Sequence, residues 1–240
     1  WIRDVKENGH LWSVTDREEL YPNMKVETER YDRTKREIAD AIGEITSVWQ
    51  CGVNQREKAL SQGIKSWMDP KCTAEVMGLS GNNARVVNAM LEINRQKTDL
   101  IRPLNIATNL YNWRDAGNEM FVDFETFLDV WSEKASGIFM IGVYYHNGEK
   151  WQYKNFVAAS NTPEEERRIM TEFSEFVRSK NNPKLWYWHA ENSFWSAANN
   201  RQGLESPFEW SDLVKLFREE PIVIKDCFNF SLKNIANAMN

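Results

Sequence analysis

The sequence is poor in cysteine and histidine, and it lacks any long apolar run. Its three cysteines, Cys51, Cys72 and Cys227, form no CxxC pair, which excludes the disulfide framework of small secreted domains and fits a reducing compartment. No apolar run approaches the roughly 18 to 20 residues of a membrane span, and no signal peptide opens the chain. We therefore expect a soluble, cytoplasmic protein with no membrane partner.

A strong charge of either sign is also missing. Charged residues make up 27% of the 240 residues, and their charges sum to only −5. This balance excludes a chain-wide basic surface that holds nucleic acid through its phosphates alone. Any contact with nucleic acid must therefore be local. The chain is long enough for two small domains, each with its own hydrophobic core.

The ends of the chain are those of a segment. The first residue is Trp1, and the last stretch, FSLKNIANAMN, reads as a helix without a glycine cap or a polar tail. We therefore expect a fragment of a longer polypeptide. Residues 1–31 are expected to be an irregular N-terminal segment that could end an upstream domain.

Residues 32–100 have the pattern of a small, all-helical domain. Apolar residues recur at intervals of three and four around Ile38 and Ile42, and again from Val86 to Ile93. Between these runs, apolar turns lead to Gly52 and then to Gly78 and Gly81. This layout is typical of helix-hairpin-helix modules, in which hairpin glycines let backbone N–H groups approach a DNA phosphate. A packed helical spacer with glycine caps has the same pattern, so both interpretations remain open.

The periodicity changes after a linker at residues 101–117. Three short β-rich runs follow, EMFVDFETF, GIFMIGVYYHNG and WQYKNFVA, of which the last two are joined by Asn147-Gly148. Thr162 and Pro163 then head an amphipathic helix. The strand LWYWHA, helices from Glu191 and Trp210, the apolar run IVIKD and a closing helix complete the chain. The order βββαβα predicts an α/β fold with a mixed, RNase H-like sheet over residues 118–240.

Two acids on the first of these strands are the strongest chemical signal. Asp123 and Glu125 are two positions apart, so both carboxylates project from one side of a strand that is otherwise almost entirely apolar. Burial of two like charges costs several kcal/mol unless a cation or a proton relieves it, and a divalent ion with oxygen ligands does so. The alternative is an edge strand with a solvated acidic side.

Further polar groups follow LWYWHA. His189 and Glu191 come at the carboxyl end of that strand, where open α/β sheets place functional groups. Glu191 reads either as a third metal ligand or as an acid that favours the start of a helix. His189 reads as a catalytic residue or as a member of the aromatic cluster. Trp188 and Trp195 could stack on unpaired bases, although such residues more often belong to a core.

Taken in order, the motifs FVDFET, YWHAE, SDLVKLF and FSLKNIA resemble a known family. They are similar to the predicted RNase H-like exonuclease domain, related to the DEDD exonucleases, that is fused to RecB-like nuclease domains. The similarity covers about residues 118–240, and the segment ITSVWQCGVNQREKALSQGIKSWMDPKC looks like the helical connector of such fusions. Asp123 and Glu125 match the first motif and Glu191 the second, where Asp is usual, while Asp212 lies in the DL before the SLK helix. The last motif acid of the family would lie beyond Asn240.

The resemblance implies a function. That function is hydrolysis of a phosphodiester in DNA or, less expectedly, RNA, from a 3′ end and with two divalent ions about 3.5–4 Å apart. Asp123, Glu125 and Glu191 would be the metal ligands, His189 would orient water, and Asp212 is the candidate to replace the missing acid. All-carboxylate ligands favour Mg²⁺ or Mn²⁺. An upstream RecB-like domain would be covalently continuous with this segment. The alternative is a non-catalytic nucleic-acid-binding or scaffold module with an incomplete metal site.

Overall fold

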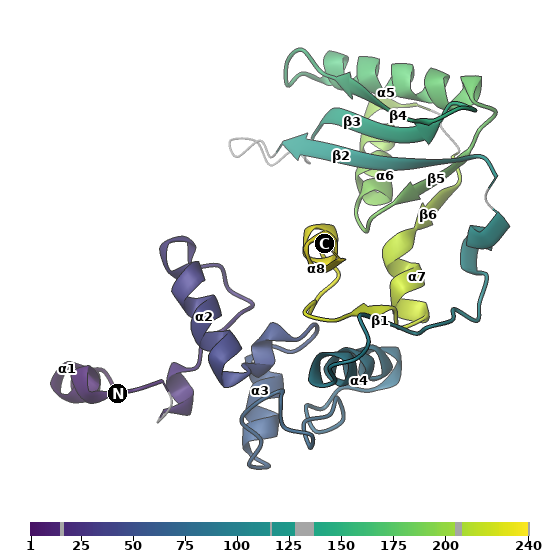
Figure 1. Cartoon of the computed structure of the whole chain (residues 1–240). Helices are drawn as coiled ribbons and strands as arrows, with labels where there is room; N and C mark the ends of the chain where they lie inside the picture. The colour runs from purple at the N-terminus through teal and green to yellow at the C-terminus, as the bar shows by residue number, and fades with distance from the viewer. Residues whose placement is uncertain (15–16, 116, 128–136, 205–207, 240) are drawn as a thin grey trace. The chain divides into compact units, whose positions relative to one another are not determined.

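The computed structural model describes residues 1–14, 17–115, 117–127, 137–204 and 208–239 (Figure 1). These residues form two compact units. The first unit is Trp1–Ile106 together with the segment that starts at Arg218, and the second is Ala107–Phe217. The predicted linker therefore coincides with the first passage between the units. The segment from Arg218, which we had assigned to the second domain, belongs to the first unit.

The first unit is mainly helical within the described ranges. Its α-helices are α1 Ile2–Asn8, α2 Asp32–Ile42, α3 Val53–Leu60, α4 Gly81–Arg95 and α8 Leu232–Met239. Short 3-10 turns are η1 Gly9–Leu11, η2 Glu18–Leu20, η3 Glu29–Tyr31 and η4 Ile45–Ser47. The N-terminal segment that we expected to be irregular therefore contains a helix and several turns.

The first unit also contains two strands, both outside the helical domain expected at residues 32–100. Strands β1 Ile101–Arg102 and β7 Val223–Ile224 pair antiparallel in the first unit. The pairing continues at Lys225, whose N–H donates to the Leu100 carbonyl at 2.9 Å. The run IVIKD is buried at Val223 and Ile224, so its apolar side chains hold the last segment of the chain in this unit rather than in the second.

Helix α4 provides much of the buried surface of the first unit. Its buried residues follow the helical period and include Val86, Val87, Met90, Leu91 and Ile93. The three- and four-residue spacing in the sequence predicted this helix, and the structure confirms it.

The connection between α3 and α4 differs from a helix hairpin. Residues 61–80 contain no helix, and the segment is buried at Ile64, Cys72, Ala74 and Met77. The Met77 Sδ lies 3.6 Å from the Cys51 Sγ. Burial raises the pKa of Cys51 to about 12, so this thiol behaves as an apolar core group. Apolar side chains spaced through the connection therefore hold it as a packed loop.

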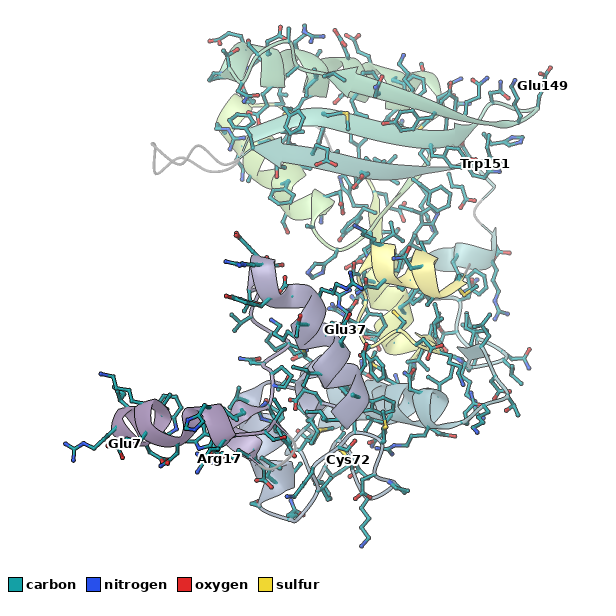
Figure 2. The ribbon with its side chains drawn as sticks, turned by 60° about the vertical axis from the view of Figure 1, so that its left-hand side comes forward. Glu7, Arg17, Glu37, Cys72, Glu149 and Trp151 are labelled. Atoms are coloured by element: carbon teal, nitrogen blue, oxygen red, sulfur yellow. The ribbon has the colours of Figure 1, made fainter. Side chains whose placement is uncertain are left out.

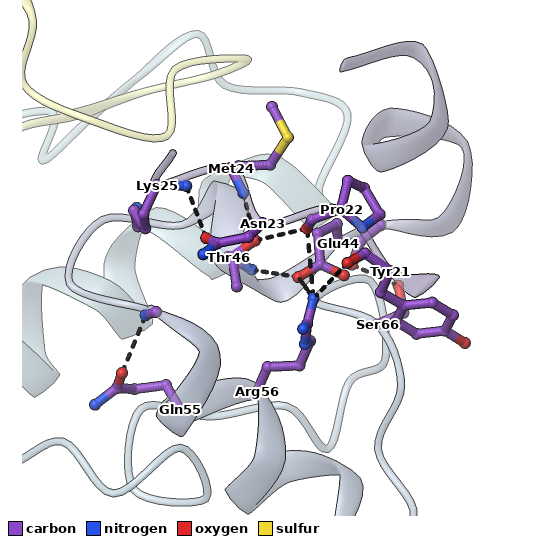
Figure 3. A network of polar contacts seen from close by, with 12 residues as sticks. Tyr21, Pro22, Asn23, Met24, Lys25, Glu44, Thr46, Gln55, Arg56 and Ser66 are labelled. Atoms are coloured by element: carbon purple, nitrogen blue, oxygen red, sulfur yellow. Dashed lines mark hydrogen bonds and ion pairs between the residues drawn. The ribbon is translucent and has the colours of Figure 1, made fainter. Parts of the chain in front are cut away.

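Within the first unit, a buried ion pair holds the chain around Tyr21 and Pro22 against α3 (Figure 3). The Arg56 guanidinium lies 3.1 Å from the Glu44 carboxylate and also donates to the Tyr21 and Pro22 carbonyls. The Thr46 N–H donates to the same Glu44 oxygen at 3.0 Å. Glu44 has no exposed surface, so its charge depends on these donors.

The second unit is built on a five-stranded mixed sheet. Its elements are η5 Leu110–Asp115, β2 Glu119–Phe127, β3 Gly137–His146, β4 Trp151–Val157, α5 Pro163–Ser179, β5 Lys184–Tyr187, α6 Glu191–Gln202, β6 Trp210–Asp212 and, up to Phe217, α7 Leu213–Glu219. The strand order is β4-β3-β2-β5-β6. Strands β2, β3 and β4 are antiparallel neighbours, whereas β5 runs parallel to both β2 and β6 (Figure 1). The unit is therefore a mixed α/β structure.

Local sequence explains the elements that we predicted. In the turn between β3 and β4, the Asn147 side chain accepts the N–H groups of Glu149 and Lys150, each at 3.0 Å, and Gly148 has a φ of 102°. At the start of α5, the Thr162 hydroxyl accepts the Glu165 N–H, and Pro163 is the first helical residue. The meander and the capped helix are both confirmed.

Helices α5 and α6 cover one face of this sheet. The core between them includes Met120, Val122 and Phe124 from β2, Phe173 from α5 and Trp195 from α6. Alternate residues of each strand point into this core. The other residues of the same strands therefore lie on the opposite face of the sheet, which we call the open face.

One detail of the sheet differs from the sequence prediction. Residues Trp210–Asp212 form β6, where we expected a helix to begin. This strand is only three residues long, and it forms because Trp210 pairs with Leu185 and packs against the core. Such a tertiary cause leaves no period in the sequence. No helix in the described part of the chain has the length and apolar character that a membrane crossing needs.

The Glu44–Arg56 pair gives a first prediction. Arg56→Met should lower the free energy of unfolding by about 3 kcal/mol, because it leaves a buried carboxylate without its cation. Urea denaturation monitored by circular dichroism checks this. Arg33→Met is the matched control, since Arg33 pairs with Glu37 on an exposed helix surface and should change little. An equal effect of the two substitutions would contradict the role assigned to the pair.

A second prediction concerns Glu166, which connects α5, α6 and β3. Burial alone would raise its pKa, but hydrogen bonds from Arg201, Gln202 and the Ile138 N–H outweigh burial and hold the pKa below its ordinary value. This stabilisation is therefore complete above about pH 4.3, the ordinary glutamate pKa, and is lost as pH falls through the lowered value. Glu166→Gln should remove that part of the pH dependence in urea titrations, and Glu164→Gln, on the exposed first turn of α5, should not.

Candidate carboxylate site

The pleat of β2 places the two acids of the first motif together. Met120, Val122 and Phe124 are buried in the core, while Asp123 and Glu125 are exposed. Both acids therefore lie on the open face of the sheet, as the alternation predicted. On the neighbouring strand β3, Asp123 is paired with Gly142 and Glu125 with Met140.

Glu191 approaches this pair from the carboxyl end of β5. Strand β5 ends at Tyr187, and Glu191 is the first residue of α6. The register pairs Phe121 with Trp186, so Asp123, two residues further along β2, lies level with the end of β5. The Glu191 side chain is buried, and its Oε2 accepts the N–H groups of Trp188 and Ala190, each at 3.2 Å.

The charges of these acids are coupled through Asp123. Although the residue is exposed, partial burial of its carboxyl group against the sheet raises the pKa of Asp123, and the charge of Glu125 raises it further. Burial also raises the pKa of Glu191, and the charge of Asp123 adds to that effect. Asp123 is therefore the acid that interacts with both of the others. Like charges that raise one another's pKa are characteristic of functional sites.

The three carboxylates do not form one preassembled ligand set. Within the described residues, no three His, Cys, Asp or Glu side chains are placed to hold a metal ion together. The expected close convergence of Asp123, Glu125 and Glu191 is therefore not seen. Two of the three carboxylates are engaged by nearby donors: Glu191 accepts backbone N–H groups at its own helix start, and Asp123 accepts the Phe124 N–H.

His189 and Asp212 have different surroundings. His189 is exposed in the loop between β5 and α6, and its φ of 86° is rare for a residue other than glycine. Asp212 is the last residue of β6, where it is paired with Tyr187 of β5, and its carboxylate accepts the Val214 N–H at 2.8 Å. Asp212 therefore caps α7. Its charge lies near Tyr187, where burial and then Asp212 raise the pKa of the phenol.

The residues predicted to contact nucleic acid divide in two. Trp195 is only 2% exposed and belongs to the core, so its stacking role is wrong; Trp188 is half-buried and packs edge-on against Phe217 at 5.1 Å. Among the hairpin glycines, Gly52 donates its N–H to the Gln55 side chain and Gly78 donates to the Glu75 carbonyl. Gly81 begins α4 with a φ of 61°.

The open face carries aromatic residues that the sequence argument did not single out. They are Tyr144 on β3 and Trp151 and Tyr153 on β4, all exposed. The signal that could have found them is the alternation of WQYKNFVA, in which Trp151 and Tyr153 share the phase opposite to the core residue Phe156.

No protein-family model matches the chain, and no curated protein matches it. The argument for function therefore depends on the geometry of this site.

The coupling of the acids gives a third prediction. Asp123→Asn should lower the pKa of Glu191 toward its ordinary value, because it removes the neighbouring charge that contributes to the raised pKa. Carboxyl ¹³C NMR titration of the labelled protein measures this. Glu149→Gln, at the exposed β3–β4 turn, is the control and should leave Glu191 unchanged. A Glu191 titration that is identical in Asp123→Asn and in the unmodified protein would show that the two side chains do not interact.

Proposed function

We propose that the second unit is an RNase H-like nuclease domain that hydrolyses phosphodiester bonds with divalent metal ions, as a 3′–5′ exonuclease. One observation carries the proposal. Asp123 and Glu125 share the open face of the central strand β2, and Glu191 is coupled to Asp123 from the carboxyl end of the adjacent parallel strand.

The topology of the sheet supports this reading. Three antiparallel strands are followed by α5, after which β5 returns beside β2, the first strand of the meander. A return of the fourth strand beside the first through a helical crossover is the arrangement expected of an RNase H-like sheet. The acids then lie on the strand at the centre of the sheet and at the start of the helix after β5.

The residues present fit a hard divalent cation. All three candidate ligands are carboxylates, the ligand type that suits Mg²⁺ and Mn²⁺. Burial raises the pKa of Asp123 and of Glu191, and the charge of a neighbouring carboxylate raises each pKa further, so a bound cation would stabilise the charged forms of both acids. Bound at this place, Mg²⁺ or Mn²⁺ would activate water and stabilise the leaving 3′ oxygen.

The chain's own residues would have distinct roles in that reaction. Asp123 is coupled to both other acids and would be the central carboxylate that holds the cation. Glu125 would hold one side of the site from the open face. Glu191 would have to exchange its backbone N–H partners for a cation, which its position at a helix start allows. His189, exposed beside these groups, would hold the attacking water by a hydrogen bond.

A second candidate function is favoured by a specific observation. The described acids provide no three-ligand set, and Asp212, our candidate for an additional ligand, is engaged as the cap of α7. These features fit a non-catalytic module that binds nucleic acid or serves as a scaffold. For the same reason, we expect residues 1–240 to bind metal weakly and to cut DNA or RNA poorly.

Metal binding gives the fourth prediction. Mg²⁺ or Mn²⁺ should raise the melting temperature, with a stabilisation of about 1.4 kcal/mol at a metal concentration tenfold above Kd. Asp123→Asn should abolish the increase, because it removes the acid coupled to both others. Differential scanning calorimetry in EDTA and in increasing Mn²⁺ measures the effect.

Glu149→Gln provides the matched control, since it removes one exposed carboxylate of the same unit outside the site. Its metal-dependent stabilisation should equal that of the unmodified chain. Equal stabilisation of Asp123→Asn and Glu149→Gln would mean that the metal acts elsewhere. Stabilisation by metal without any cleavage of single-stranded or double-stranded oligonucleotides, even at high enzyme concentration, would favour the non-catalytic module.

A further inference from the structure

Three exposed aromatic side chains lie together on the open face of the sheet. Tyr144 is 46% exposed, Trp151 39% and Tyr153 60%. Trp151 begins β4, just after the β3–β4 turn that contains Glu149 (Figure 2). By contrast, the core residue Trp195 is 2% exposed. Soluble proteins rarely expose several large aromatic side chains that are in contact with one another.

These residues are neighbours across β3 and β4. The register pairs Tyr144 with Tyr153 and His146 with Trp151, so all four side chains lie on the same face. The rings of Tyr144 and Trp151 are stacked, with their centroids 5.0 Å apart and their planes 12° from parallel. The ring of Phe121 on β2 packs against the ring of Trp151, with the two centroids 5.7 Å apart. The group therefore extends over three strands.

Gly142 connects this aromatic group to the candidate site. A Cβ at position 142 would lie 2.8 Å from the Tyr153 hydroxyl and 3.3 Å from its ring. The Tyr153 side chain therefore lies across Gly142, and only glycine leaves room for it there. Gly142 is also the residue paired with Asp123. Paired residues on adjacent strands are about 5 Å apart, so the aromatic group begins beside the carboxylates.

We propose that Tyr144, Trp151 and Tyr153 form a platform on which the bases of an unpaired nucleic-acid strand stack, with the strand's end at Asp123 and Glu125. This inference rests on the proposed function of the carboxylate site. Stacking on aromatic rings tolerates any base, and it requires bases that are not already paired in a duplex. The platform would therefore select single-stranded over double-stranded substrate.

The position of the aromatic group favours this occupant. Its exposed tyrosine and tryptophan rings begin beside the carboxylates proposed to act on a phosphodiester, so a strand whose end lies at those acids would pass over the rings. The three rings carry no positive charge, and Lys184, on the same face of β5, already donates to the Tyr111 carbonyl. Bases rather than phosphates are therefore the groups that the platform can hold.

Cross-strand aromatic pairs also stabilise sheets, so the test must separate binding from folding. The probe is a short fluorescein-labelled methylphosphonate oligothymidylate, whose backbone is uncharged. It can bind through its bases without any metal ion. Fluorescence anisotropy with the full chain in EDTA measures its affinity, and circular dichroism melts verify that each variant is folded.

The variants are Trp151→Val and Tyr153→Thr, which remove the ring and introduce a β-branched residue that favours a strand. Each should weaken binding by about 5- to 100-fold, the usual effect of removing one stacking ring. Tyr31→Thr removes an equally exposed tyrosine of the first unit and should have no effect. Gly142→Ala should weaken binding although Tyr153 is still present, because the added methyl group displaces its ring.

The outcomes separate this inference from the proposed function. Binding of the neutral oligomer is measured in EDTA and should occur whether or not Mn²⁺ stabilises the chain, so a failure of metal-dependent stabilisation would overturn the function and not the platform. Absence of binding, equal affinity for the oligomer paired with its complement, or unchanged affinity of folded Trp151→Val and Tyr153→Thr would overturn the platform. A dimer in sedimentation velocity that Trp151→Val dissociates would show that the face binds a second copy instead.

Discussion

The two-residue period of β2 is the constraint on which the second unit depends. Because Met120, Val122 and Phe124 must enter the core under α5 and α6, Asp123 and Glu125 must leave it on the opposite face. A shift of one residue would bury both acids and expose the core. The same strand therefore closes the hydrophobic core and concentrates negative charge, and the central position of β2 brings Glu191 within electrostatic reach from β5. The core residues and the candidate site residues of β2 therefore lie on opposite faces of the same strand.

Sequence reasoning succeeded where the cause was local. The extent of β2, the Asn147-Gly148 turn and the Thr162 cap of α5 each follow from residues a few positions apart, and each is found. The shared face of Asp123 and Glu125 follows from alternation in the same way. These features needed no knowledge of the rest of the chain.

Sequence reasoning failed where the local structure depends on residues that are far apart in the sequence. Strand β6 forms through its pairing with β5. Strand β7 pairs with β1, although the whole sequence of the second unit lies between them in the chain. The buried loop at residues 61–80 has no period to reveal it. Within the site, the direction of the Glu191 carboxylate is set by competition between neighbouring charges and backbone N–H groups, and no motif records which of these wins. The aromatic residues of β4 had a readable signal, but their exposure depends on which sheet face the helices cover.

The pairing of β1 with β7 has a consequence for the order in which the chain folds. The second unit is continuous in sequence, so every strand of its sheet is available once Phe217 has been synthesised. Strand β1 is made earlier, yet it has no partner until Val223 and Ile224 follow. During synthesis, the first unit can therefore be completed only after the second. Until then, the apolar residues around Ile101 lack their partner strand while the sheet of the second unit forms.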